Sequence, residues 1–230
     1  DLTMASIIPL LIASVSATIS SRLIIGDALI LHIDSVEKFD LGNMPFYILM
    51  GVFCGLISVL FSKVFFRTTT LLKKIKHKIS RAIWGGLFLG IILFLIPPLF
   101  GEGFSTINLL LADKGQEIIS GSYIESFCTT ETILFVIIFI MLLFKIIATS
   151  VTIGIGGIGG VFAPSLFLGA SLGYVFAKVM NHFFWLDLSI SNFSLVSMAG
   201  LVAGVLHAPL TAIFLIAEIT SGYELFIPLM

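Results

Sequence analysis

Four apolar stretches limit what this chain can fold into: residues 5–25, 46–66, 82–100 and 132–152 carry at most one charge each. A helix of about 20 apolar residues spans the hydrocarbon core of a bilayer. Only 11% of the 230 residues are charged and 58% are hydrophobic, whereas about a quarter of the residues in a soluble domain are charged. Because so few charges cannot cover a soluble globule, the sequence predicts an all-α integral membrane protein in which residues 1–230 form a single transmembrane domain.

Positive charge is concentrated in one place, since residues 63–81 include seven Lys and Arg side chains and no acid. Acidic residues instead dominate residues 27–40 and 113–125. Lys and Arg concentrate in cytoplasmic loops, so we expect residues 67–81 on the cytoplasmic side and the acidic stretches outside. A basic run can also bind nucleic acid, but the apolar flanks favour an orientation signal, and no nucleic-acid partner is expected.

The apolar segments after residue 160 are shorter than those before it. Residues 165–180 give a helix of about 24 Å, less than the roughly 30 Å of the hydrocarbon core, and residues 193–206 and 209–220 are shorter still. Transporters aim such half-helices at a substrate, and the backbone between them must be buried in protein or line a polar cavity. We therefore expect a multi-helix bundle with short, broken and re-entrant helices. The alternatives are full spans whose ends lie outside these limits, or interfacial helices.

Small residues recur at four-residue spacing, which lets helix backbones approach closely. The longest ridge comprises Ser165, Gly169, Gly173 and Ala177, and shorter glycine pairs lie at 51 and 55, 86 and 90, and 200 and 204. The pattern predicts close helix packing in lipid but no particular activity.

The most flexible stretch is GIGGIGG, residues 154–160, with five glycines in seven positions. Gly154, Gly156 and Gly159 satisfy the G-x-G-x-x-G spacing of a dinucleotide site. However, no acid stands about 20 residues further on and no soluble βαβ unit surrounds them, so we reject that interpretation. Close helix packing explains some of these glycines, but not five of them directly before a proline-headed segment.

Pro164 suits the first turn of a helix, where its missing N–H costs nothing. The residues just before it would present free backbone N–H groups: Gly160, Val161, Phe162 and Ala163. Such donors cannot stay unpaired at membrane depth, and an anion would satisfy them with help from the positive end of the helix dipole. Residues 151–173 contain no Lys or Arg, so the ion would be held weakly enough to leave again. The pattern favours a conduit for anions.

The stretch GGVFAPSLFLGASLG resembles the G-x-F-x-P signature of CLC chloride channels and chloride/proton exchangers. The signature is matched by Gly160, Val161, Phe162, Ala163 and Pro164. GEGF at 101–104 and LVAGVLHAPLTAIFLIAEIT at 201–220 are similar to stretches on either side of the signature in that family. The order and spacing of the segments fit the second half of a CLC subunit over nearly the whole chain.

This resemblance implies an all-helical, CLC-like fold in which the chain forms half of an inverted repeat. It implies chloride as the transported ligand, a multi-pass location with the cell membrane favoured, a homodimer in the lipid bilayer, and an N-terminal half of the same chain beyond this sequence. The backbone N–H groups of Val161 and Phe162 would then coordinate the anion, with Gly160 allowing the approach and Pro164 starting the helix behind it. Neither a cofactor nor enzymatic activity is implied.

Two features of the family are missing from this sequence. A G-S-G-I-P stretch, whose serine touches the anion, and a G-R-E-G-P stretch, whose glutamate gates it, do not occur, and the chain ends before the pore-lining tyrosine. The resemblance therefore supplies one wall of the pathway and leaves the choice between channel and exchanger open.

Other polar residues support weaker alternatives. Glu218 lies in an apolar segment but next to TSGY, so we interpret it as an acid at the membrane edge rather than half of a catalytic pair. Lys145 precedes the glycine loop by about two turns, and we expect it to extend to an interface rather than to raise the local potential. The four histidines lack metal-site spacing, so no metal is expected. A membrane-embedded enzyme and a non-transporting scaffold are the alternative functions.

Overall fold

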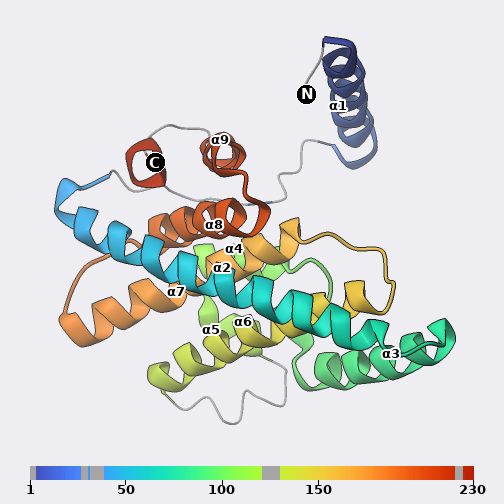
Figure 1. The fold of residues 1–230 in the computed structure, drawn as a ribbon. Helices are drawn as coiled ribbons and strands as arrows, with labels where there is room; N and C mark the ends of the chain where they lie inside the picture. The colour runs from blue at the N-terminus through green and yellow to red at the C-terminus, as the bar shows by residue number, and fades with distance from the viewer. Residues whose placement is uncertain (1–3, 27–30, 32–38, 121–129, 221–224) are drawn as a thin grey trace. The chain divides into compact units, whose positions relative to one another are not determined.

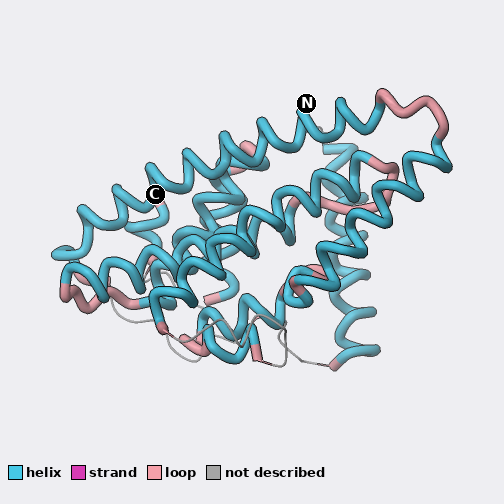
Figure 2. Tube along the Cα trace, turned by 90° about the horizontal axis from the view of Figure 1, so that it is seen from below, coloured by secondary structure: helices cyan, strands magenta, loops and turns pink. Residues whose placement is uncertain are grey.

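The computed structural model describes residues 4–26, 31, 39–120, 130–220 and 225–230. Within these ranges the chain is helical and contains no strand (Figure 2), which confirms the all-α prediction. The chain divides into two compact units, residues 1–32 and residues 33–230, and each is described by itself. Two parts of the acidic stretches lie outside the described residues: most of residues 27–40, and residues 121–125 of the stretch at 113–125. Which side of the membrane each stretch faces therefore stays a prediction.

The first unit consists of helix α1, Met4–Ile25. Its segment Ile7–Ile24 is long and apolar enough to cross a membrane, and none of it is buried within the structure. Apolar side chains such as Ile12, Val15 and Ile19 are more than half exposed. A helix that is apolar all round needs lipid or further protein around it.

The described residues of the second unit contain four more helices that are long and apolar enough to cross a membrane: α2 (Met44–Lys73), α3 (Lys78–Leu95), α6 (Glu131–Gly154) and α7 (Phe162–Phe184). Its shorter helices are α4 (Phe104–Leu111), α5 (Gly115–Ile119), α8 (Ile190–Leu206), α9 (Pro209–Ile219) and α10 (Phe226–Leu229). Two single 3₁₀ turns lie at Leu41–Asn43 and Pro97–Leu99. The four long apolar runs of the sequence thus correspond to four membrane-length helices: α1, α2, α3 and α6.

Helix α7 is longer than the sequence indicated. We predicted a short segment at 165–180, but the helix has 23 residues and continues through Asn181, so that prediction is wrong. The side chain of Asn181 donates to the carbonyl of Leu188 at 2.9 Å and accepts from the Leu188 N–H at 2.8 Å. Because the following loop satisfies the amide, Asn181 does not break the helix. Helices α8 and α9 are short, as predicted.

The helices of the second unit pack in a row, with α6 on α7, α7 on α8 and α8 on α9. Helix α2 crosses this row and contacts both α6 and α8 (Figure 1). A core cluster joins α2, α6, α7 and α8, and includes Met50, Leu142 and Leu168. At one end of the cluster the rings of Tyr47 and Phe193 stack, with their centroids 4.2 Å apart.

The contact between α7 and α8 is the most extensive in the structure and depends on the predicted ridge. A Cβ atom at Gly169 would lie 2.3 Å from the Cα of Met198, and one at Gly173 would lie 2.4 Å from the Cα of Ser194. Only hydrogen atoms fit between these backbones, so the prediction of close packing along this ridge is confirmed.

The shorter glycine pairs divide into two groups. Gly200 and Gly204 of α8 pack on Cys54 and Ser58 of α2, where a Cβ would meet sulfur at 3.0 Å and oxygen at 2.7 Å. The pairs at 51 and 55 and at 86 and 90 have no heavy atom within 4 Å of an added Cβ among the described residues. For these two pairs the packing prediction is wrong within the described chain, because their faces of α2 and α3 are open.

Candidate functional site

The site lies where α6 ends and α7 begins, and the glycines between them serve two different purposes. A Cβ at Gly154 would lie 2.7 Å from Leu72 of α2, and one at Gly157 would lie 2.7 Å from the carbonyl oxygen of Thr152. Gly156 adopts a φ of 99°, which side chains rarely tolerate. These three glycines therefore let the chain turn sharply against its neighbours.

Gly159 and Gly160 are not required by packing. An added Cβ at Gly159 has no heavy atom within 4 Å, and one at Gly160 meets only the backbone nitrogen of Phe162, at 4.0 Å. Neither residue has a positive φ. The missing side chains leave open space next to the start of α7.

Helix α7 begins at Phe162, and its first backbone hydrogen bond runs from the Ser165 N–H to the Val161 carbonyl at 3.0 Å. The hydroxyl of Ser165 also donates to that carbonyl, at 2.6 Å. Among the described residues, no acceptor is found for the N–H groups just before Pro164: Gly160, Val161, Phe162 and Ala163. Pro164 occupies the first turn, as expected, so the helix start offers a cluster of unpaired donors.

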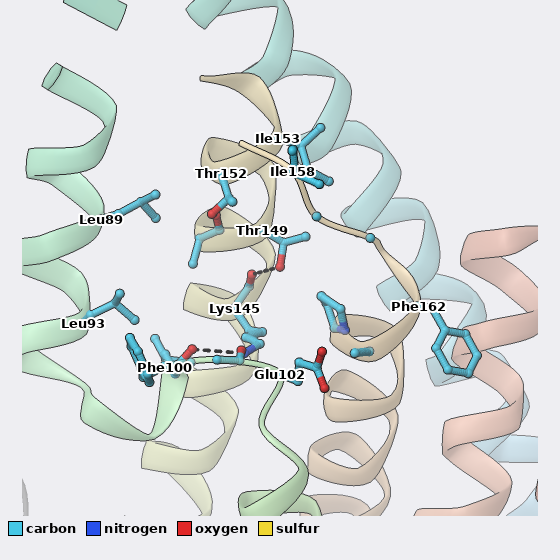
Figure 3. A pocket seen from close by; sticks show the side chains of 17 residues that line it. Leu89, Leu93, Phe100, Glu102, Lys145, Thr149, Thr152, Ile153, Ile158 and Phe162 are labelled. Atoms are coloured by element: carbon cyan, nitrogen blue, oxygen red, sulfur yellow. Dashed lines mark hydrogen bonds between the residues drawn. The ribbon is translucent and has the colours of Figure 1, made fainter. Parts of the chain in front are cut away.

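Three of the residues that carry these donors, Gly160, Phe162 and Ala163, border a cavity of about 540 Å³, whereas Val161 packs against the core cluster. The walls of the cavity come from α3 (Leu89 and Leu93), residues 99–102, α6 (among them Thr149 and Thr152), residues 158–160 and residues 162–164. In Figure 3 the ring of Phe162 points away from the space that Lys145 and Glu102 face. At this position the backbone of α7, rather than the side chain of Phe162, is therefore available to a ligand in the cavity.

Lys145 corrects one expectation, because its side chain does not extend to an exposed interface. It is only 3% exposed, and its ammonium donates to the carbonyls of Leu99 and Gly101 at 3.0 and 2.9 Å. The Nζ atom also lies 4.8 Å from the centre of the Phe167 ring. A buried cation bound only by neutral groups contributes a positive potential to the adjoining cavity.

Glu102 lines the same cavity and is exposed. It stands between Gly101 and Gly103, which have φ values of 68° and 87°, and a Cβ at Gly103 would lie 2.5 Å from the Phe167 ring. The sequence related Lys145 to the glycine loop but not Glu102, which 51 residues separate from Gly154. The available signal for Glu102 was the resemblance of GEGF at 101–104 to a stretch of the CLC family.

The cavity's hydroxyl groups are already engaged. Thr149 and Thr152 donate to carbonyls one turn earlier on α6, those of Lys145 and Ala148, each at 2.8 Å. Their oxygens can still accept, but their protons are used within the helix. The N–H groups at the start of α7 therefore remain available to an anion, together with the third N–H of the Lys145 ammonium.

Features that would support catalysis lie apart from this cavity. Glu218 is exposed on α9 next to the end of the helix, where no second carboxylate is recorded close to it in the described chain. Within the described residues, no group of three His, Cys, Asp or Glu side chains is placed to hold a metal ion.

Comparison with known proteins decides the family. The model of the voltage-gated chloride channel family matches residues 1–230. The chain belongs to the voltage-gated chloride channel family. Its multi-pass location in a membrane agrees with this membership and with the five membrane-length helices.

Relatives of this voltage-gated chloride channel family member include channels and exchangers. Chloride channel protein CLC-f of Arabidopsis thaliana is 28% identical over 96% of this chain and 28% of its own length. The H(+)/Cl(-) exchange transporter ClcA of Vibrio cholerae is 28% identical over 99% of this chain and 46% of its own length.

A solved structure shares the fold. The crystal structure of a slow cyanobacterial Cl⁻/H⁺ antiporter superimposes with a TM-score of 0.73 at 25% identity, covering 94% of this chain and 47% of that one. The chain therefore spans less than half the length of the proteins it matches.

Proposed function

We propose that this chain forms half of a pathway that carries chloride or a similar anion across a membrane, as a channel or as a chloride/proton exchanger. The anion is held by backbone N–H groups at the start of α7. The observation that carries the proposal is the set of unpaired donors at Gly160, Val161, Phe162 and Ala163, three of which belong to residues that line a cavity of about 540 Å³: Gly160, Phe162 and Ala163. Pro164 starts the helix behind the site.

Three features support this site. Gly159 and Gly160 leave the approach to the donors open. The helix dipole places the equivalent of about half a positive charge at the same end of α7. Lys145 adds a buried positive charge to the cavity wall. Because the donors are dipoles rather than a cation in direct contact, the ion can leave as readily as it enters.

The other half of the pathway would come from the part of the protein that this chain does not include. The relatives are more than twice as long as this chain, and the resemblance implies a partner half related by an inverted repeat. The same resemblance implies a homodimer in the lipid bilayer. Large apolar side chains that are more than half exposed on α9 and α10, Leu210, Phe214 and Ile227, supply a surface that such a dimer or the lipid would cover.

The test compares two substitutions at Val161, one of which removes the backbone donor. Val161→Pro removes the N–H, whereas Val161→Ala shortens the side chain and keeps it. A lost hydrogen bond to a charged group is worth about 1.5–3 kcal/mol, so we expect chloride binding to the full-length protein to weaken at least tenfold in the proline variant only. Isothermal titration with chloride measures this.

A second comparison tests the role of the side chain. Phe162→Ala should change chloride affinity little, because its ring points away from the cavity (Figure 3). If the alanine variant at 162 lost more affinity than the proline variant at 161, the ligand would be a side chain and the proposed backbone site would be wrong.

A further inference from the structure

The turn between α2 and α3 lies at a membrane surface, because only residues 74–77 join two membrane-length helices. We call Lys73, Lys74, Lys76, Lys78 and Arg81 the basic turn. Its four lysines are exposed, and no acid occurs in residues 63–81. The turn therefore presents an uncompensated positive surface at the level of the lipid headgroups.

Apolar side chains flank the basic turn. Leu71, Ile79, Ile83 and Trp84 are 53%, 77%, 62% and 65% exposed. Tryptophan favours the boundary between headgroups and acyl chains, and clustered lysines next to a membrane helix attract anionic lipids. Cations beside exposed apolar side chains match the two parts of an anionic phospholipid better than they match a soluble polyanion.

Arg81 has an unused donor at this surface. Its Nε atom is buried, and no hydrogen-bond partner for it is found among the described residues. A guanidinium binds phosphate oxygens through two parallel N–H donors. The Nε atom is shielded, so a phosphate at the basic turn would bind the part of the guanidinium that the half-buried Arg81 leaves accessible.

The basic turn also lies next to the glycine loop of the candidate anion site. A Cβ atom added at Gly156 would lie 3.9 Å from the Nη2 atom of Arg81. On either side of this contact, Leu72 packs on Gly154, and the side chain of Ile155 packs on Gly85 of α3. A shift of the turn cannot leave the loop unchanged, because these contacts are close-packed.

We propose that the basic turn binds the headgroups of anionic phospholipids and that this contact, transmitted through Arg81, fixes the position of the glycine loop. The lysines supply long-range attraction, and Arg81 supplies the direct phosphate contact. The second half of the proposal, regulation of anion affinity, rests on the proposed function.

Trp84 reports directly on lipid binding. The full-length protein, with every tryptophan except Trp84 replaced by Phe (including Trp185), is reconstituted into vesicles with brominated phosphatidylglycerol or brominated phosphatidylcholine, which quench nearby indole fluorescence. We expect a several-fold preference for the anionic lipid at Trp84. Replacing Lys73, Lys74, Lys76 and Lys78 with Gln should bring the preference close to one, since the attraction of anionic lipids depends on these cations. The matched control replaces the same lysines with Arg and should keep the preference.

Three results would overturn lipid binding. These are equal quenching by both lipids in the native turn, a preference that survives the four Gln substitutions, and a preference that inorganic phosphate removes while sodium gluconate of equal ionic strength does not. The last result would identify free phosphate, rather than a lipid headgroup, as the ligand.

The regulatory half is tested by chloride affinity in vesicles with and without phosphatidylglycerol. We expect the affinity to differ at least threefold between the two compositions, and the difference to disappear in Arg81→Gln. A constant affinity, or a difference that persists in Arg81→Gln, would refute the coupling. If chloride did not bind at all while the lipid preference persisted, the proposed function would fail and the lipid site would stand.

Discussion

The ammonium of Lys145 donates to the carbonyl oxygen of Gly101 at 2.9 Å, although the two residues lie on different sides of α4 and α5 in the sequence. A second bond to Leu99 makes Lys145 a clamp between α6 and the segment that follows α3. The charge that lines the cavity therefore also holds one of its walls.

Replacing Lys145 with Met tests this double role. The substitution keeps the length of the side chain but leaves two carbonyls without a donor, and an unsatisfied buried group costs about 1–3 kcal/mol. We expect the thermal midpoint of the detergent-solubilised protein to fall by several degrees and chloride affinity to fall as well. Lys145→Arg, which keeps the charge, should retain most of the affinity; an unchanged midpoint in Lys145→Met would contradict the clamp.

Adding a methyl group at Gly160 tests the open approach to the donors. In Gly160→Ala the new carbon would lie 4.0 Å from the Phe162 nitrogen and clash with no protein atom. We expect chloride affinity to fall about tenfold, equivalent to about 1.4 kcal/mol, without loss of thermal stability. Gly86→Ala is the matched control, since its methyl group would meet nothing within 4 Å and Gly86 does not line the cavity. Equal affinities in the two variants would show that the anion does not approach past Gly160.

The contact between α7 and α8 predicts a stability difference between two glycines. Gly169→Ala would place a methyl group 2.3 Å from the Met198 backbone, and overpacking of this kind costs about 1–3 kcal/mol or more. Gly51→Ala enters open space and should be neutral or stabilising by about 0.5–1 kcal/mol, because alanine favours helix. Folded yield and thermal midpoint measure both; similar behaviour of the two variants would rule out the close packing.

Asp113 connects the turn after α4 to α7 through its ion pair with Lys178, at 2.8 Å. Its φ of 57° is left-handed, a conformation that Asn tolerates and Ala resists by about 1–2 kcal/mol. Because both partners are partly exposed, Asp113→Asn should cost at most about 1 kcal/mol, and Asp113→Ala should cost more. Unfolding at low and at high salt separates the two effects, since only the ion pair is screened. Equal losses for Asn and Ala would exclude backbone strain at this position.

Much of the fold could be read from the sequence, because membrane helices follow from local hydropathy. The four long apolar runs and the ridge at Gly169 and Gly173 needed no knowledge of tertiary structure. The end of α7 could not be placed, since Asn181 is satisfied by Leu188 in the following loop. The exposed faces of Gly51 and Gly86 were equally hidden, because spacing alone does not say what lies opposite a glycine.

The candidate site was predictable only where its chemistry is local. The order of Gly160, Phe162 and Pro164 indicates free donors at a helix start before any neighbour is known. The cavity is not local, because Lys145 reaches it through carbonyls of residues 99 and 101. Arg81 was likewise assigned only to a charged loop, although its guanidinium lies beside Gly156.

The close contact between the backbones of α7 and α8 has a mechanical consequence. Two helices whose main chains touch at Gly169 and Gly173 have no compliant side chains between them, so neither can slide or tilt without carrying the other. The N–H donors at the N-terminus of α7 therefore belong to a rigid pair of helices. Among the described walls of the cavity, a change in a route past them would therefore involve α3 and the segment around Glu102 rather than a movement of α7 against α8.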